Sequence, residues 1–176
     1  SYQKRQKALR RLLEKKSVIY DLIEYFEPSC IKDPISYDYS ISDKDFERYN
    51  RTDLSGNKIS LDSDQKNAFR QIISSGPVSA LQGPPGTGKT EFIAAFVHYL
   101  FEKLNTKNIL LVSQSHTAVD TAAERIKRHS VRLDTNLEIV RFSNNENIVL
   151  NSLKNALSNS LINEKRELFK AEYQFR

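Results

Sequence analysis

The sequence predicts an α/β fold built on a parallel sheet, and three observations lead to this class. A short apolar segment, 77–81, is followed by a glycine-rich loop and then by a helical pattern that runs to Leu104. Two further apolar segments, 109–112 and 137–142, are separated by another helical pattern. Strands alternating with helices indicate a doubly wound parallel sheet, with a ligand site at the carboxyl ends of its strands.

The N-terminal residues 1–27 are predicted to form a basic amphipathic helix that Pro28 ends. Residues 1–16 carry a net charge of +6, while the whole chain carries +5, so the basicity belongs to this one segment. Two interpretations stay open for it. The charges form a solvated helix face, or they form an arm that contacts phosphates.

Residues 28–60 are rich in Asp, Ser and Tyr and predict a linker or a small irregular subdomain. Asp62 then has the character of a helix N-cap, with Gln65 three residues later, the spacing of a capping box. Apolar residues at helical spacing follow and predict a helix that ends near Gly76.

A complete phosphate-binding loop spans Gly83 to Thr90, with four residues between Gly83 and Gly88. Glycines let the main chain curl closely around phosphates, and the next helix aims its positive end at the same anion. Lys89 is expected to reach the β- and γ-phosphates, and the Thr90 hydroxyl is expected to coordinate Mg²⁺. This loop predicts a nucleotide site.

Behind the loop, 109–112 is a continuous apolar run and predicts a strand buried on both faces of the sheet. A helix is expected at about 117–129, and 61–146 together form the predicted nucleotide-binding domain. The tail, 147–176, has no Gly or Pro and predicts one long helix, either an arm of a helical hairpin or a partner for the N-terminal helix.

The composition limits the classes of protein. No apolar run of about 18 residues exists, so no membrane span or membrane partner is expected. The single Cys30 fits a reducing compartment, and a cytoplasmic location is expected. Because the chain contains no Met at all, it is expected to be a fragment of a longer protein.

Three segments, 61–69, 82–90 and 111–120, together resemble the start of the motor domain of superfamily 1 helicases of the Upf-like branch. The resemblance implies an incomplete RecA-like P-loop NTPase fold with long terminal helices. It implies that Gln65 reads the adenine edge, a role that suits an amide because an amide both donates and accepts. It also implies that the loop at 113–120 contacts the backbone of single-stranded DNA or RNA.

The resemblance implies ATP and Mg²⁺ as cofactors, Lys89 as the catalytic residue and Thr90 as the Mg²⁺ ligand. Its implied partners are single-stranded DNA or RNA and the rest of a parent helicase, and exposed sheet edges are expected to allow self-association. The implied nucleotide-binding residues are Gln65, Gly83, Pro84, Pro85, Gly86, Thr87, Gly88, Lys89 and Thr90. The implied nucleic-acid-binding residues are Ser115, His116 and Thr117.

The sequence departs from the family's pattern at three places. Gln114 stands where the family often has Pro, and after Arg141 the family's second basic residue is replaced by Asn147. No Asp-Glu dipeptide occurs, so the carboxylates that hydrolysis requires are not identified. The chain is therefore expected to bind ATP but to hydrolyse it negligibly.

Alternative interpretations remain at this point. A protein-remodelling ATPase of the AAA type has a similar loop, and a non-catalytic nucleotide-binding interaction module is a third possibility. Completing the capping box with Asp62 is an alternative role for Gln65 that is compatible with adenine reading, and capping the third helix is an alternative role for Ser115 or Thr117.

Overall fold

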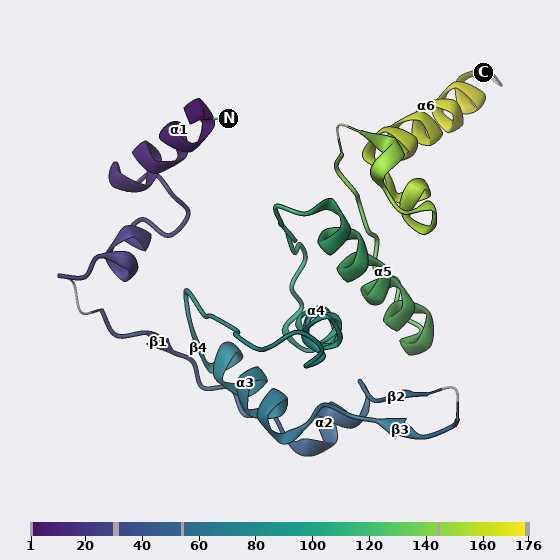
Figure 1. Cartoon of the computed structure of the whole chain (residues 1–176). Helices are drawn as coiled ribbons and strands as arrows, with labels where there is room; N and C mark the ends of the chain where they lie inside the picture. The colour runs from purple at the N-terminus through teal and green to yellow at the C-terminus, as the bar shows by residue number, and fades with distance from the viewer. Residues whose placement is uncertain (1, 30–31, 54, 144, 175–176) are drawn as a thin grey trace. The chain divides into compact units, whose positions relative to one another are not determined.

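The computed structural model describes residues 2–29, 32–53, 55–143 and 145–174 (Figure 1), and Cys30 lies outside them. The chain forms two compact units, each described by itself. The first consists of Ser1–Phe46 and Leu61–Gln82, and the second of Glu47–Ser60 and Gly83–Arg176. The domain boundaries expected from the sequence stay predictions.

Short elements dominate the first unit. Its elements are α1 (Tyr2–Leu13), the 3₁₀ helix η1 (Leu22–Phe26), β1 (Ile35–Ser36), α2 (Asp43–Glu47, whose last residue belongs to the second unit), α3 (Ser63–Ser74) and β4 (Ser75–Gly76). The elements of the second unit are β2 (Arg51–Thr52), β3 (Lys58–Ile59), α4 (Lys89–Leu104), α5 (His116–Leu133), the 3₁₀ helices η2 (Glu146–Ile148) and η3 (Asn151–Ala156), and α6 (Ser158–Gln174).

The prediction of one helix over 1–27 is wrong, because α1 ends at Leu13 and η1 is a separate element. Lys15 adopts a left-handed backbone conformation, with φ of 54°, which interrupts the helical hydrogen bonding. None of the residues of α1 is buried, so no tertiary packing lengthens it.

A predicted helix forms in the first unit as α3. Its capping box is complete: the Gln65 N–H donates to Asp62 at 2.7 Å, and the Asp62 N–H donates to the Gln65 side chain at 3.1 Å. Phe69 is fully buried and meets the ring of Phe46 edge to face, with centroids 5.2 Å apart. These contacts form the aromatic core of the first unit.

In the second unit, α4 packs against α5 (Figure 1). The contact is built from small and branched apolar residues, because Ala94 and Val97 of α4 meet Ile126 of α5. The helix predicted to reach Leu104 is confirmed as α4, and α5 includes the predicted 117–129 helix but is longer. This helix pair carries both candidate site segments of the second unit.

The prediction of one helix over 147–176 is wrong, because η2 and η3 precede α6. Leu153 and Leu157 are buried against Ala123 of α5, together with Val149. Packing these apolar residues against α5 is incompatible with one straight helix over 147–176. The chain therefore turns before α6 begins.

The predicted parallel sheet is absent from the described residues. Segments 77–81, 109–112 and 137–142 contain no strand, and the two ladders present, β1 with β4 and β2 with β3, are antiparallel. The prediction that 109–112 is buried on both faces is wrong, since Leu110 is 79% and Val112 is 80% exposed. A groove of about 620 Å³ lies between this segment and 137–142, so the two make no ladder.

A strand is stable only when neighbouring strands pair its N–H and C=O groups. Among the described residues of these three segments, only Arg141 pairs in this way, in an isolated parallel bridge with Leu157. The structure is therefore a mixed helix and strand protein with small sheets. Among the described helices, none is long and apolar enough to cross a membrane.

Candidate nucleotide and nucleic-acid sites

The loop from Gly83 to Thr90 leads directly into α4, as the sequence predicts. Gly86 and Gly88 adopt left-handed conformations, with φ of 84° and 74°. A Cβ on Gly83 would approach the Thr87 hydroxyl to 2.9 Å, whereas at Gly86 it would meet no atom within 4 Å. The backbone therefore needs glycine for its conformation at two positions and for close approach at a third.

Lys89, the first residue of α4, points back over the loop. Its Nζ donates to the Gly83 carbonyl at 2.6 Å and to the Pro84 carbonyl at 2.5 Å. The Thr87 hydroxyl also donates to the Pro84 carbonyl, at 2.9 Å. The ammonium group is thus held beside the loop by neutral acceptors, which a bound anion would replace with a stronger, charge-assisted partner.

The loop suits a metal ion that is bound mainly through phosphates. Thr90 is the second residue of α4 and offers one hydroxyl. No cluster of three or more His, Cys, Asp or Glu side chains suited to a metal occurs among the described residues. Mg²⁺ commonly uses one or two protein ligands together with substrate phosphates and water, so this donor set fits it.

Gln65 lies in α3 of the first unit, where its side-chain oxygen accepts from the Asp62 N–H. The capping role considered for it is therefore confirmed. Its role in reading adenine stays a prediction.

The predicted nucleic-acid residues lie together at the start of α5 and are exposed. Ser115 is the N-cap, and its hydroxyl accepts from the Ala118 N–H at 3.4 Å, so the capping alternative is confirmed for this residue. His116 Nδ1 lies 3.3 Å from the Arg141 guanidinium. Strand contact by Ser115, His116 and Thr117 stays a prediction.

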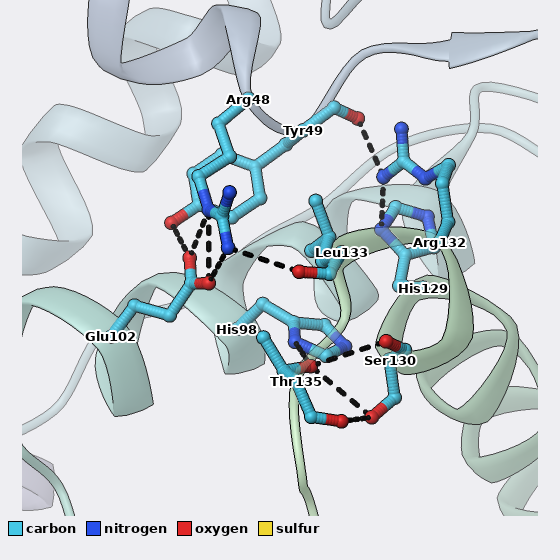
Figure 2. A network of polar contacts seen from close by, with 9 residues as sticks. All are labelled: Arg48, Tyr49, His98, Glu102, His129, Ser130, Arg132, Leu133 and Thr135. Atoms are coloured by element: carbon cyan, nitrogen blue, oxygen red, sulfur yellow. Dashed lines mark hydrogen bonds and ion pairs between the residues drawn. The ribbon is translucent and has the colours of Figure 1, made fainter.

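A polar network that sequence reasoning missed joins α4, α5 and the segment before β2 (Figure 2). Glu102 of α4 accepts from Arg48 Nε at 2.9 Å and from the Tyr49 hydroxyl at 2.9 Å. Arg132 of α5 donates to the Tyr49 carbonyl at 3.2 Å and lies 2.9 Å from His129 Nδ1. Arg48 and Tyr49 are thereby tied to both helices of the second unit.

The network extends to the phosphate-binding loop through Glu91, which directly follows Thr90. Glu91 accepts a hydrogen bond from His129 Nε2 and pairs with Arg125 at 3.1 Å. Burial alone would raise the pKa of Glu91, but the hydrogen bond from His129 and the charges of His129 and Arg125 hold it below its ordinary value. The sequence shows only that an acidic residue, Glu91, follows the loop. It does not reveal that its partner is His129, 38 residues further along the chain.

Three other groups in this network have shifted pKa values. The hydrogen bond from Arg48 lowers the pKa of Glu102, aided by that from Tyr49. Burial lowers the pKa of His98, whose Nε2 donates to the Ile126 carbonyl at 3.0 Å. Burial likewise raises the pKa of Tyr49.

These shifts predict a protein that loses stability in acid in two steps. His98 stabilises the fold fully above its unfolded pKa of about 6.5 and loses that contribution as the pH falls below it, because the unfolded chain binds the proton more readily. Glu91 and Glu102 stabilise the fold above their unfolded pKa, and this contribution is lost as the pH falls through their lowered folded values. Urea unfolding midpoints measured from neutral to acidic pH report both steps.

Variants assign each step of the acid profile. His98→Gln keeps an amide donor for the Ile126 carbonyl but cannot titrate, so it is expected to flatten the upper step only. Glu102→Gln is expected to reduce the lower step. An unchanged upper step in the His98→Gln protein would contradict this assignment.

Comparisons with known proteins give one family and several relatives. A family model described as an AAA domain matches residues 60–174. The chain is 42% identical over 81 residues to Regulator of nonsense transcripts 1 of Caenorhabditis elegans, covering 46% of this chain and 7% of that protein. It is 37% identical over 87 residues to ATP-dependent helicase NAM7 of Saccharomyces cerevisiae, covering 49% of this chain and 8% of that protein.

A further similarity is to DNA polymerase alpha-associated DNA helicase A of Schizosaccharomyces pombe. The two are 34% identical over 71 residues, which cover 40% of this chain and 10% of that protein. The chain thus spans a tenth or less of the length of these three relatives. No solved structure is significantly similar to it.

Proposed function

Because this chain belongs to the AAA domain family, we propose that it is the ATP-binding part of a nucleic-acid-dependent ATPase of the helicase type. Its similarity to the Upf-like branch of superfamily 1 is borne out by its relatives, which include proteins named as ATP-dependent helicases. The observation that carries the proposal is the glycine loop with Lys89 and Thr90 at the start of α4. Those helicase names favour this function over a protein-remodelling ATPase.

Each candidate residue has a role in this proposal. Lys89 binds the β- and γ-phosphates of ATP, Thr90 holds Mg²⁺ beside them, and Gln65 reads the adenine. When bound, Mg²⁺ supplies charge neutralisation between the phosphates. In the longer protein, segments 77–81, 109–112 and 137–142 join a RecA-like parallel sheet once neighbouring strands pair with them.

The start of α5 is proposed to contact single-stranded DNA or RNA. Ser115, His116 and Thr117 are exposed there, next to backbone N–H groups at the positive end of an 18-residue helix. Such contacts position the strand through its phosphates and do not recognise its bases.

Single-strand binding tests this function. A fluorescently labelled oligonucleotide is expected to bind the chain with an affinity that falls as salt rises, since phosphate contacts release counterions. His116→Ala is expected to weaken binding, while His98→Gln, which alters a buried imidazole, is the matched control. Binding that His116→Ala leaves unchanged would contradict the proposed contact.

The chain on its own is expected to hydrolyse ATP negligibly, because it contains no Asp-Glu pair to hold Mg²⁺ and to orient water. Phosphate release measured with and without single-stranded nucleic acid checks this. Turnover that Lys89→Ala abolishes would refute the expectation.

A cytoplasmic location and self-association complete the proposal. Leu110, Val112 and Phe142 expose large apolar side chains in the second unit, and such surface favours association with other protein surfaces. Light scattering distinguishes an associating chain from a monomer, and fluorescence microscopy of the tagged longer protein tests the location.

A further inference from the structure

A buried ion pair lies behind the start of α5. Asp120 is fully buried and Arg141 is 7% exposed, and Arg141 Nε donates to Asp120 Oδ1 at 2.6 Å. The other Asp120 oxygen accepts from the Leu150 N–H at 3.1 Å. Arg141 Nη1 donates to the Phe142 carbonyl at 2.6 Å. The guanidinium is therefore held in one orientation by two acceptors, and its aspartate is held in turn by the backbone.

This orientation directs the third guanidinium nitrogen at His116. Arg141 Nη2 lies 3.3 Å from His116 Nδ1. A guanidinium has donors only, so Nδ1 of His116 acts as the acceptor and carries no hydrogen. The imidazole is then neutral, with its hydrogen on Nε2. Because His116 is exposed, this N–H is free to meet a ligand.

We propose that Arg141, anchored by Asp120, is a positioning residue that holds His116 so that its Nε2–H donates to a phosphate or sugar oxygen of a bound single strand. The inference rests on the proposed nucleic-acid function and deepens it. Arg141 itself does not contact the strand, because it is buried and its polar groups are already paired.

The arrangement has a clear physical advantage. A free surface histidine samples several side-chain rotamers and both neutral tautomers, and binding must restrict it to one. The hydrogen bond from Arg141 restricts His116 to one rotamer and one tautomer before the strand binds. His116 and Asp120 are four residues apart on one helix, so a single guanidinium reaches both side chains.

A double-mutant cycle on the full chain tests the proposal. Arg141→Lys keeps a positive charge for Asp120, but a single ammonium group lacks the planar fork that also reaches His116. Arg141→Lys and His116→Ala are each expected to weaken single-strand binding about two- to tenfold, the value of one hydrogen bond. The double variant is expected to bind no more weakly than His116→Ala alone.

Ring ¹⁵N chemical shifts of His116, measured without nucleic acid, give a second readout. The wild-type chain is expected to show the Nε2–H tautomer, and Arg141→Lys a mixture of tautomers. Retention of the single tautomer in Arg141→Lys would overturn the proposal. The proposal would also be overturned if Arg141→Lys weakened binding equally in the wild-type and in the His116→Ala background. Arg141 would then affect binding through the fold and not through His116.

The two readouts separate this inference from the function on which it rests. A wild-type chain that binds no single strand overturns the proposed function and the strand contact together. The tautomer measurement decides independently whether Arg141 orients the His116 ring.

Discussion

Replacing Asp120 with Ala is expected to lower the free energy of unfolding by about 3–5 kcal/mol, because it leaves the buried Arg141 charge without a partner. It also removes the acceptor of the Leu150 N–H. Both side chains of the pair are almost inaccessible, so water cannot replace the lost contacts. Urea denaturation of the two proteins at neutral pH measures the difference.

The matched control is Asp120→Leu combined with Arg141→Leu. Replacing both partners of a buried ion pair by apolar residues avoids the uncompensated charge, so this double variant is expected to recover much of the lost stability. A loss below about 1 kcal/mol for Asp120→Ala alone, the value typical of an exposed pair, would show that the pair is not buried in solution.

Replacing Lys89 with Ala is expected to weaken ATP binding about ten- to hundredfold, since one charge-assisted hydrogen bond or more to the phosphates is lost. Stability is expected to change by less than about 0.5 kcal/mol, because the acceptors of the Lys89 ammonium are carbonyls of a largely exposed loop. Calorimetric titration with ATP and Mg²⁺ measures the affinity.

Lys103→Ala serves as the control, since it removes a lysine from the last turn of the same helix, at the opposite end from the loop. It is expected to leave ATP binding unchanged. Equal losses from Lys89→Ala and Lys103→Ala would mean that the helix, and not the loop, determines the affinity.

The elements that could be predicted from the sequence depend on local signals. The capping pair of Asp62 and Gln65 predicts the start of α3, and the apolar residues at three- and four-residue steps predict α4. Two glycines of the phosphate-binding loop, Gly86 and Gly88, have left-handed conformations that glycine adopts readily. In each case the deciding interactions join residues a few positions apart.

The strands and the long terminal helices could not be predicted in this way. Whether 109–112 forms a strand depends on partners distant in sequence. Exposure alternates along this segment, so the protein covers only one of its two sides. Leu153 and Leu157 suit a helix seam, but burial against α5 takes precedence. The contact of Glu91 with His129 and that of Asp120 with Arg141 bring together residues 38 and 21 positions apart, which no local pattern reveals.

Nuclear magnetic resonance mapping of ligand binding tests the central claim most directly. ATP with Mg²⁺ is expected to shift the backbone amides of the phosphate-binding loop, and a single-stranded oligonucleotide is expected to shift those at the start of α5, from Ser115 to Thr117. Loop amides that ATP leaves unchanged, or oligonucleotide shifts confined to other surfaces, would contradict the assignment of this chain as the nucleotide-binding part of a nucleic-acid motor.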